Sequence, residues 1–322
     1  MKHIFIINPT AGKRDSTQKI YAMAEALRQN HGQEVECILT KRQGHATEIA
    51  QRLCQSEEEL RFYACGGDGT VNEVANGILG YDNAAMTCIP VGTGNDFLRN
   101  FGPDAPLFSD AENLWDGPVF QMDVIDVNGR AALTIACAGL DARVARDVHK
   151  YGDSPLLTGK GSYVMALIVN FIFRPISSHW TVELDGVANQ AKDYAVITAC
   201  NGRFYGGGFM PVAEARMDDR VLNTLIVKKI SRPTFLRFVG PYSKGEYHRF
   251  PQLATCHTAK TIRIRSDQPD IVTCLDGECI VADDVTIRLS DKRLNFFGPV
   301  GCNCNSNARG APSAGSRDPA TV

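Results

Sequence analysis

The sequence predicts an N-terminal three-layer α/β domain with a mostly parallel sheet, followed by an antiparallel β-sandwich domain. Strand and helix patterns alternate over the first 100 residues, the order that builds a parallel sheet covered by helices. Short β-rich segments separated by turn residues dominate after about residue 123, which is typical of a sandwich. A glycine-rich turn at 66–70 joins a strand pattern to a helical one, as at the ligand-binding edge of such a sheet.

The first 100 residues are expected to form four strands and four helices in alternation. The strands are short apolar runs that end in turn residues, at 3–8, 35–40, 61–65 and 86–91. The helices have apolar residues at helical spacing, at 16–30, 45–54, 70–79 and 95–100. The carboxyl ends of parallel strands meet at one edge of a sheet. The residues that follow these strands should therefore converge: Asn8, Thr40, Gly66 and Gly92.

The remaining chain is expected to consist mainly of strands separated by turns such as Asn128-Gly129. The predicted strands are 122–127, 131–136, 180–184, 194–199, 224–227, 261–265, 272–275 and 285–289. Helices are predicted near 163–173 and 233–242, and the segment 294–297 is expected to return to the first domain. The predicted division is an α/β domain at 1–122, a β-sandwich domain at 123–290, a return segment at 291–301 and a disordered tail at 302–322.

Composition is that of an ordinary globular protein. The chain has 322 residues, of which 44% are hydrophobic and 22% charged, and this length suggests two domains or one large one. The net charge of −2 gives no reason to expect a nucleic-acid partner. The eleven cysteines are interpreted as reduced thiols. Cys302 and Cys304 form a C-x-C pair, for which a zinc site is the alternative to a disordered tail.

The sequence predicts a cytoplasmic protein that is at most peripheral at the inner face of the membrane. No signal peptide opens the chain. The longest nearly apolar run, at 163–173, has 11 residues, which is too short to span a bilayer. This run is interpreted as a buried helix, and the wall of a lipid-accepting groove is the alternative.

The most informative segment is the turn at 66–70. Gly66, Gly67 and Gly69 let backbone N–H groups approach a phosphate without clashes from Cβ atoms, and the following helix adds the positive end of its dipole. Asp68 lies in the middle of this turn. A carboxylate among phosphate-binding amides suits a site where Mg²⁺ or a cationic side chain bridges it to a nucleotide. The segment therefore indicates phosphoryl transfer from a nucleoside triphosphate.

Two further turns follow predicted strands of the first domain. The first runs from Asn8 to Lys13 and is either a phosphate-contacting loop with Lys13 as counter-charge or an ordinary βα turn. The second contains Gly92 and Gly94, which again permit close backbone approach. Asp96 is interpreted as support for a metal or a lysine, with a helix N-cap as its alternative role.

Three segments of the second domain carry candidate polar groups. Asp276-Gly277-Glu278 is either a hairpin turn or the source of the base that a kinase acting on a hydroxyl requires. Gly206-Gly207-Gly208 is a loop, and Asp218-Asp219 is either a solvated turn or a site for a hard cation bound through oxygen ligands.

Together these segments resemble the soluble bacterial diacylglycerol kinases and YegS-like lipid kinases. That family lies within a larger group that also holds sphingosine, ceramide and NAD kinases. The shared motifs follow the family order: Asn8-Pro9-x-x-Gly12-Lys13, Thr40 with Gly44-His45-Ala46, Gly66-Gly67-Asp68-Gly69-Thr70-x-Asn72-Glu73, Gly92-Thr93-Gly94-Asn95-Asp96-Phe97, Gly206-Gly207-Gly208, Met217-Asp218-Asp219 and Asp276-Gly277-Glu278. The resemblance implies an NAD-kinase-like and diacylglycerol-kinase-like fold. It also implies an ATP- and Mg²⁺-dependent lipid kinase that converts diacylglycerol to phosphatidic acid.

The resemblance implies a nucleotide site at the cleft between the domains and a lipid site in the second domain. ATP would contact Asn8, Pro9, Thr10, Ala11, Gly12, Thr40, Gly66, Gly67, Asp68, Gly69, Thr70, Val71, Asn72, Thr93, Gly94 and Asn95. Asp68, Asp96 and Lys13 would form a charged network linked through water to Mg²⁺. Asp276 would be the general base, with Glu278 beside it in the catalytic set.

The resemblance also implies a second, structural Mg²⁺. Its ligands would be the carbonyl of Arg216, the carboxylate of Asp219 and the carbonyl of Val221. The family pattern is Asp-Asp-Gly where this chain has Asp218-Asp219-Arg220. A residue with a Cβ atom disfavours positive φ, and an arginine brings positive charge beside the proposed cation, so this site departs most from the family.

Alternatives remain for the substrate and for the activity. Another lipid alcohol, such as a sphingoid base, ceramide or monoacylglycerol, is the main alternative substrate. NAD kinase is disfavoured because the second half has no segment like that enzyme's Thr-Pro-Thr-Gly-Ser-Thr-Ala-Tyr. Arg220 leaves open a catalytically weak, lipid-binding regulatory protein of the same fold. The lipid would be reached peripherally, and the sequence does not distinguish a monomer from a homodimer.

Overall fold

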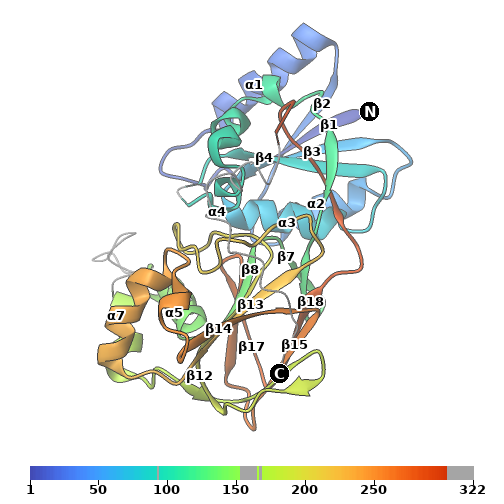
Figure 1. Ribbon diagram of the computed structural model, residues 1–322. Coiled ribbons are helices and arrows are strands. Elements are labelled where there is room, and N and C mark those ends of the chain that lie inside the picture. Colours follow the sequence, from blue (N-terminus) through green and yellow to red (C-terminus); the bar gives the residue numbers. More distant parts are fainter. Residues whose placement is uncertain (93, 153–164, 167–168, 303–322) are drawn as a thin grey trace.

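The computed structural model describes residues 1–92, 94–152, 165–166 and 169–302 (Figure 1). Thr93, the predicted disordered tail from residue 303 onward with Cys304, and part of the apolar run at 163–173 therefore lie outside the described residues. The cysteines within the described residues are free thiols, as expected. No helix in the described part of the chain is long and apolar enough to cross a bilayer.

The N-terminal domain is built on a six-stranded sheet in the order β2-β1-β3-β4-β19-β5. Its strands are β1 (Lys2–Ile7), β2 (Glu34–Leu39), β3 (Leu60–Gly66), β4 (Ala84–Pro90), β5 (Val119–Met122) and β19 (Leu294–Phe297). Every neighbouring pair is parallel except β19 and β5, so the predicted mostly parallel sheet is confirmed. The expected return of the segment 294–297 is also observed, because β19 lies between β4 and β5.

Helices connect these strands and cover the sheet. They are α1 (Thr17–His31), α2 (His45–Leu53), α3 (Asp68–Ile78) and the short α4 (Asp96–Arg99), with 3-10 turns at Gly102–Ser109 and Ala111–Asn113. On α1 the residues at helical spacing Ile20, Ala24 and Leu27 are buried. Strands β1, β3 and β4 are almost wholly buried along their length, as expected for strands covered on both faces. Each helix therefore leads back to a strand whose carboxyl end lies at the same edge.

The C-terminal domain contains two antiparallel sheets. One has the order β11-β10-β15-β18-β6-β7 and the other β14-β13-β12-β8-β16-β17. The strands are β6 (Ile125–Val127), β7 (Arg130–Ala132), β8 (Ile135–Gly139), β9 (Ser178–His179), β10 (Thr181–Leu184), β11 (Val187–Ala188), β12 (Asp193–Cys200), β13 (Leu222–Lys228), β14 (Ala254–Ala259), β15 (Thr261–Arg265), β16 (Ile271–Leu275), β17 (Glu278–Ala282) and β18 (Asp284–Leu289). A core that includes Trp180, Ile197, Ile226 and Ile287 lies between the two sheets.

Helices α5 (Leu140–Gly152) and α7 (Arg232–Tyr242) pack beside the second of these sheets in the lower part of Figure 1, next to a π-helical turn at Val169–Phe173 and a 3-10 turn at Tyr247–Arg249. A helix near 233–242 was predicted, whereas α5, β14 and β17 were not. The segment that forms α5 is rich in charged residues, and its buried residues within 140–148 are Leu140, Ala142, Val144 and Asp147. Three apolar residues at spacings of two, with a buried acid after them, give a weak helical pattern, which is why the sequence did not reveal this helix.

Two predicted strands are each divided in the structure. The expected strand at 122–127 is split between β5 and β6 because the chain leaves the first sheet at Asp123 and enters the other domain. The expected strand at 131–136 is interrupted at Leu133 and Thr134, whose N–H groups bind the carboxylate of Asp276. The Asp276 carboxylate thus accepts the hydrogen bonds that carbonyl groups of a neighbouring strand would otherwise accept.

Candidate active site

The loops after β1, β3 and β4 meet backbone to backbone at the carboxyl edge of the first sheet. A Cβ atom on Gly92 would lie 2.6 Å from the Cα atom of Gly67, and one on Gly12 would lie 2.3 Å from the carbonyl oxygen of Val91. Any residue other than glycine would push these loops apart. The Asn8 side chain adds a polar link, since its Nδ2 donates to Thr70 Oγ1 at 3.2 Å. The predicted convergence of the loops after β1, β3 and β4 is thus observed.

The loop after β2 joins the same edge. The Thr40 N–H donates to the carbonyl of Ile7 at 2.8 Å. Glu73 of α3 accepts hydrogen bonds from the N–H groups of Gly44 (2.9 Å) and Ala46 (3.1 Å), which places a carboxylate at the positive end of α2. Glu73 belongs to the glycine-rich motif, but nothing in the sequence indicated this capping role.

Asp68 links the two glycine-rich loops of the N-terminal domain. Its carboxylate accepts hydrogen bonds from the N–H groups of Asp96 (3.2 Å) and Phe97 (3.1 Å) at the start of α4. Burial raises the pKa of Asp68, the two N–H bonds oppose this, and the charges of Asp96 and Asp276 raise it further. Asp68 is therefore a buried carboxylate with two further carboxylates close enough to act on it.

Asp96 continues the link into the C-terminal domain. Its Oδ2 accepts a hydrogen bond from the N–H of Gly207 at 2.6 Å, and its Oδ1 forms an ion pair with Arg99 Nε at 3.0 Å. The glycine-rich loop at 206–208 is thereby placed against the start of α4, so this segment contacts the N-terminal domain.

Asp276 occupies the two-residue turn between β16 and β17. Its φ is 47° and that of Gly277 is 101°, as in the tight turns that favour Asp-Gly. The carboxylate accepts hydrogen bonds from the N–H groups of Leu133, Thr134 and Ile135 and from Thr134 Oγ1. The segment therefore forms the hairpin turn and presents a firmly oriented carboxylate, and its role as a base stays a prediction.

Asn72 joins the two domains at this carboxylate. Its Nδ2 donates to Asp276 Oδ2 at 3.2 Å and to the carbonyl of Ala131 at 3.0 Å. Asn76, one turn along α3, also donates to Ala131 and to the Asn72 carbonyl. The helix that begins in the glycine-rich turn thus carries the side chain that fixes the candidate base.

A cavity of about 290 Å³ begins at these carboxylates and extends into the C-terminal domain. Asp68, Asp96 and Asp276 line it, and so does Val71 of the predicted nucleotide set. The rest of its wall is mainly apolar and comes from α5, β12 and α7, with residues such as Val144, Val196, Phe235, Phe238 and Val239. The sequence did not reveal this pocket, because its wall is assembled from separate segments that span residues 140–242.

A polar network interrupts the apolar wall. Tyr205 donates from its hydroxyl to Asp141 Oδ2 at 3.1 Å and lies 2.7 Å from the hydroxyl of Tyr242, which in turn contacts Thr198 Oγ1 at 3.2 Å. Burial raises the pKa of Asp141 to about 6, against the bonds from Ala142 N–H, Tyr205 and the Cys137 thiol. A partly buried acid with hydrogen-bond partners therefore faces the same pocket as Asp276.

A second cavity, of about 560 Å³, lies between α2, α3, β7 and the β16–β17 hairpin. Its wall is largely polar and includes Gly44, Asn72, Arg130 and Glu278. Gln43 closes part of it by donating to Glu278 Oε1 at 2.9 Å. Asn72 thus stands between the two cavities, and Glu278 belongs to the polar one.

The remaining predicted nucleotide residues lie in the loops already described. Lys13 is exposed in the loop after β1, which also contains Pro9, Thr10 and Ala11. Asn95 has a φ of 50° and donates from Nδ2 to the carbonyl of Gly92 at 2.8 Å. A Cβ atom on Gly94 would lie 3.1 Å from Asp68 Oδ2. Thr93 lies outside the described residues.

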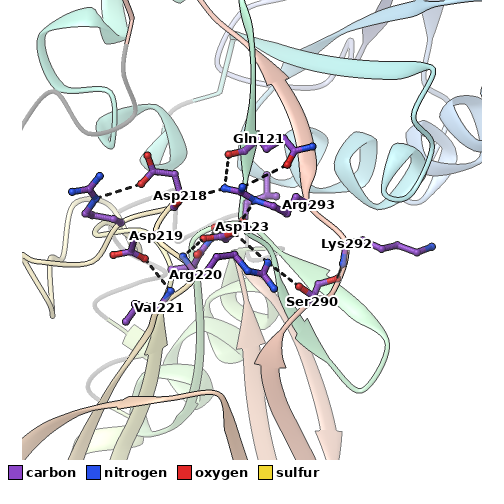
Figure 2. A network of polar contacts seen from close by, with 12 residues as sticks. Gln121, Asp123, Asp218, Asp219, Arg220, Val221, Ser290, Lys292 and Arg293 are labelled. Carbon is purple, nitrogen blue, oxygen red and sulfur yellow. Dashed lines mark hydrogen bonds and ion pairs between the residues drawn. The ribbon is translucent and has the colours of Figure 1, made fainter.

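The predicted structural-metal loop is shown in Figure 2. Asp219 Oδ1 accepts a hydrogen bond from the N–H of Val221 at 3.0 Å, and Arg220 directs its guanidinium to Asp123. Within the described residues, no three His, Cys, Asp or Glu side chains gather where they could hold a metal ion. One carboxylate with an arginine at its side does not fit a Mg²⁺ held by the protein, so no step below depends on a metal at this loop.

Comparison with known proteins now adds to the geometry. Residues 2–127 match the model of the diacylglycerol kinase catalytic domain, and residues 134–298 match that of the YegS C-terminal NAD kinase beta sandwich-like domain. A diacylglycerol kinase of Bacillus subtilis (strain 168) is 30% identical over 248 residues, which are 75% of this chain and 78% of that protein. The chain belongs to the diacylglycerol kinase family. Members of this family are lipid kinases, and the resemblance drawn from the motifs is confirmed.

Solved structures show the same fold as this diacylglycerol kinase family member. A crystal structure of a diacylglycerol kinase from Bacillus anthracis str. Sterne has a TM-score of 0.71 and 23% identity, and covers 92% of this chain and 96% of its own. An NAD kinase from Archaeoglobus fulgidus, solved in complex with ATP, has a TM-score of 0.50 and 14% identity over 93% of this chain and 94% of its own. The predicted fold class is therefore confirmed for both domains.

Proposed function

We propose that this lipid kinase transfers the γ-phosphoryl group of ATP to the hydroxyl of a membrane lipid. The observation that carries the proposal is the first cavity. Its mouth holds the carboxylates of Asp68, Asp96 and Asp276, and the remainder is a mainly apolar pocket. An apolar cavity with a few convergent polar groups at one end suits a lipid whose polar end reacts there.

The nucleotide would bind along the converging loops of the N-terminal domain. Backbone N–H groups at the start of α3, an 11-residue helix, favour a phosphate both by hydrogen bonding and through the helix dipole. Lys13 lies in the neighbouring loop and supplies positive charge. The polar second cavity beside Asn72 supports placement of the rest of the nucleotide between the domains.

Asp68 and Asp96 would hold the Mg²⁺ of the nucleotide, through water, at the mouth of the first cavity. Both carboxylates line the mouth of that cavity with Asp276, and oxygen ligands with intervening water are those that Mg²⁺ prefers. When bound, the ion would neutralise charge on the transferring phosphoryl group. Asp68 and Asp96 would thereby hold the ion beside the apolar part of the first cavity.

Asp276 would accept the proton of the lipid hydroxyl. A carboxylate offers about four acceptor positions, and its present partners already fill them. The hydroxyl would therefore replace one of these donors, and Asn72 Nδ2, at 3.2 Å, has the longest of these bonds. As the hydroxyl oxygen bonds to the γ-phosphorus, its proton passes to Asp276, the bond to the β-phosphate oxygen breaks, and ADP leaves.

The substrate can be identified by measuring transfer of labelled γ-phosphate from ATP to lipids in mixed micelles, with and without Mg²⁺. The panel contains diacylglycerol, monoacylglycerol, ceramide, sphingosine and undecaprenol, with NAD as a control. We expect Mg²⁺-dependent labelling of one lipid class and none of NAD. Labelling of no lipid by a protein that binds ATP would contradict the proposal and favour a regulatory, lipid-binding role.

Diacylglycerol is the first candidate substrate because relatives of this chain are named diacylglycerol kinases. One observation favours a second class. Tyr205 donates its hydroxyl proton to Asp141, and the hydroxyls of Tyr242 and Thr198 continue the same chain of hydrogen bonds. The group that this network offers to a ligand is therefore mainly the Asp141 carboxylate, which can only accept a hydrogen bond. A ligand that binds it must supply a donor. A lipid with a second hydroxyl or an ammonium group, such as monoacylglycerol or a sphingoid base, has one, whereas diacylglycerol has only the reacting hydroxyl.

A further inference from the structure

The two domains are connected by two crossings of the chain, and one buried carboxylate lies between them. In the described part of the chain, the first crossing runs from β5 to β6 through Asp123, and the second runs from β18 to β19 through residues 290–293. Asp123 is 0% exposed. Its backbone is held as well, since its N–H donates to the carbonyl of Met217 at 2.6 Å. A charged group in this position requires a compensating charge.

Two guanidinium groups supply that charge (Figure 2). Arg220 Nη1 donates to Asp123 Oδ1 at 3.3 Å, and the Arg220 backbone N–H donates to Oδ2 at 2.6 Å. Arg293 Nε forms an ion pair with Oδ1 at 3.1 Å. One carboxylate on the first crossing is thus bound by the second crossing and by the loop that precedes β13.

The arginines also bind backbone carbonyls on both crossings. Arg220 Nη1 donates to the carbonyl of Ser290 at 3.1 Å, and Arg293 Nη2 donates to the carbonyl of Gln121 at 2.9 Å. The N–H of Ser290 donates to the carbonyl of Val124 at 2.8 Å. The crossings are therefore joined directly and through Asp123, close to the place where the relative orientation of the domains is set.

The backbone of Arg220 shows that its side chain matters here. Its φ is 60°, in the left-handed region that glycine adopts easily and that a residue with a Cβ atom disfavours. Glycine occupies this position in the family pattern Asp-Asp-Gly. Arg220 thus has an unfavourable backbone conformation, but its side chain makes two contacts that glycine could not make, to Asp123 and to Ser290.

We infer that Arg220 is an internal cation that takes the place of a structural metal ion and fixes both interdomain crossings through Asp123. Arg220 is a positioning residue in this arrangement, because it does not line either cavity. Its effect on the reaction would come through the orientation of the domain that carries Asp276 relative to the domain that carries Asp68. The inference concerns the stability of the fold, so it stands or falls independently of the proposed substrate.

The test is thermal unfolding of the full chain without nucleotide, in EDTA and in millimolar Mg²⁺ or Ca²⁺. We expect the wild type to have the same Tm in all three. Arg220→Gly removes the guanidinium and also relieves the unfavourable φ. If the Arg220 side chain did not stabilise the fold, this variant would have an unchanged or a higher Tm. We expect instead a Tm in EDTA lower by about 5 °C or more, and partial recovery when the divalent ion is added.

Two further variants keep the test interpretable. Arg220→Lys retains the charge without the forked donor set and should lie between the wild type and Arg220→Gly. Arg249→Ala removes an exposed arginine that pairs with Glu246 and should change the Tm little, with no response to metal. A wild-type Tm that rises with Mg²⁺, an Arg220→Gly variant as stable as the wild type in EDTA, or a loss that no divalent ion reduces would overturn the inference.

Discussion

Asn72 of α3 and Asp276 of the β16–β17 turn are joined by a hydrogen bond of 3.2 Å across the two domains. The helix that carries Asn72 begins in the glycine-rich turn, and the turn that carries Asp276 opens the apolar cavity. One contact therefore relates the proposed phosphate site to the proposed base. Because Asn72 also stands between the polar and the apolar cavity, a change at this residue should affect both substrates.

Replacing Asn72 by Ala should lower kcat without preventing the fold. The variant leaves the carbonyl of Ala131 with only the Asn76 donor and removes one donor from Asp276, which should cost about 1–3 kcal/mol of stability. We expect kcat to fall by roughly tenfold or more because the variant also loses the bond to the Ala131 carbonyl, which aligns α3 with the domain that carries Asp276. Steady-state kinetics and urea unfolding check both values. Asn113→Ala, which removes an exposed amide bonded to the Leu107 carbonyl, should leave kcat unchanged.

Replacing Gly92 by Ala should separate the loops after β3 and β4. The new Cβ atom would lie 2.6 Å from Gly67 Cα, and the shift needed to admit it should cost about 1–3 kcal/mol and weaken ATP binding. Calorimetric titration with ATP and thermal unfolding measure the two effects. The matched control is Gly240→Ala in α7, where nothing lies within 4 Å of the added atom. That variant should gain about 0.5–1 kcal/mol, and equal behaviour of the two variants would contradict the close packing of the loops.

Asp141 should make a definite contribution to the pH dependence of stability. Its folded pKa is raised from 3.8 to about 6, so the folded state binds the proton more tightly than the unfolded state. The free energy of unfolding should therefore fall as pH rises from about 4 to 6, by up to about 3 kcal/mol from this group. Asp141→Asn should lose this component. Urea unfolding of both proteins across this range tests it, and parallel curves would show that Asp141 does not titrate in this way.

The same residue should affect lipid selectivity. If its carboxylate accepts a hydrogen bond from a second donor on the lipid, Asp141→Asn should lower kcat/KM for monoacylglycerol or sphingosine by about tenfold or more relative to diacylglycerol. Asp193→Asn, on the surface at β12, is the control for the amide substitution. The measurement is competition between two lipids in one micelle. An unchanged ratio would leave diacylglycerol as the favoured substrate class.

Much of the N-terminal domain and of its converging loops could be predicted from local sequence. Gly66, Gly92 and Asn8 follow strands with clear apolar patterns, and parallel strands necessarily bring their ends together. Asp276 could be named only as a candidate, because its partners Asn72 and Thr134 lie 204 and 142 residues away in the chain. No local pattern reports such distant pairings.

The apolar pocket and the interdomain cluster illustrate two different limits. The apolar pocket is lined mainly by α5, β12 and α7, and α5 was missed because it has few apolar residues and buries an acid, Asp147. Arg220 was visible as a departure from the family pattern, but its partner was not. Asp123 occurs within what the sequence presents as one continuous strand, and only the change of sheet at that residue explains why its carboxylate is buried.

The most direct test compares the wild type with Asp276→Asn in the transfer of labelled γ-phosphate to the preferred lipid. An amide cannot take the proton and nearly preserves the size of the side chain, although its NH2 group cannot accept the hydrogen bonds that one carboxylate oxygen of Asp276 accepts. A fall in kcat of at least about 10²-fold, in a folded protein whose ATP binding is close to that of the wild type, is the predicted result. Turnover within a few-fold of the wild type would remove Asp276 from the reaction and contradict the placement of the lipid hydroxyl at the mouth of the apolar cavity.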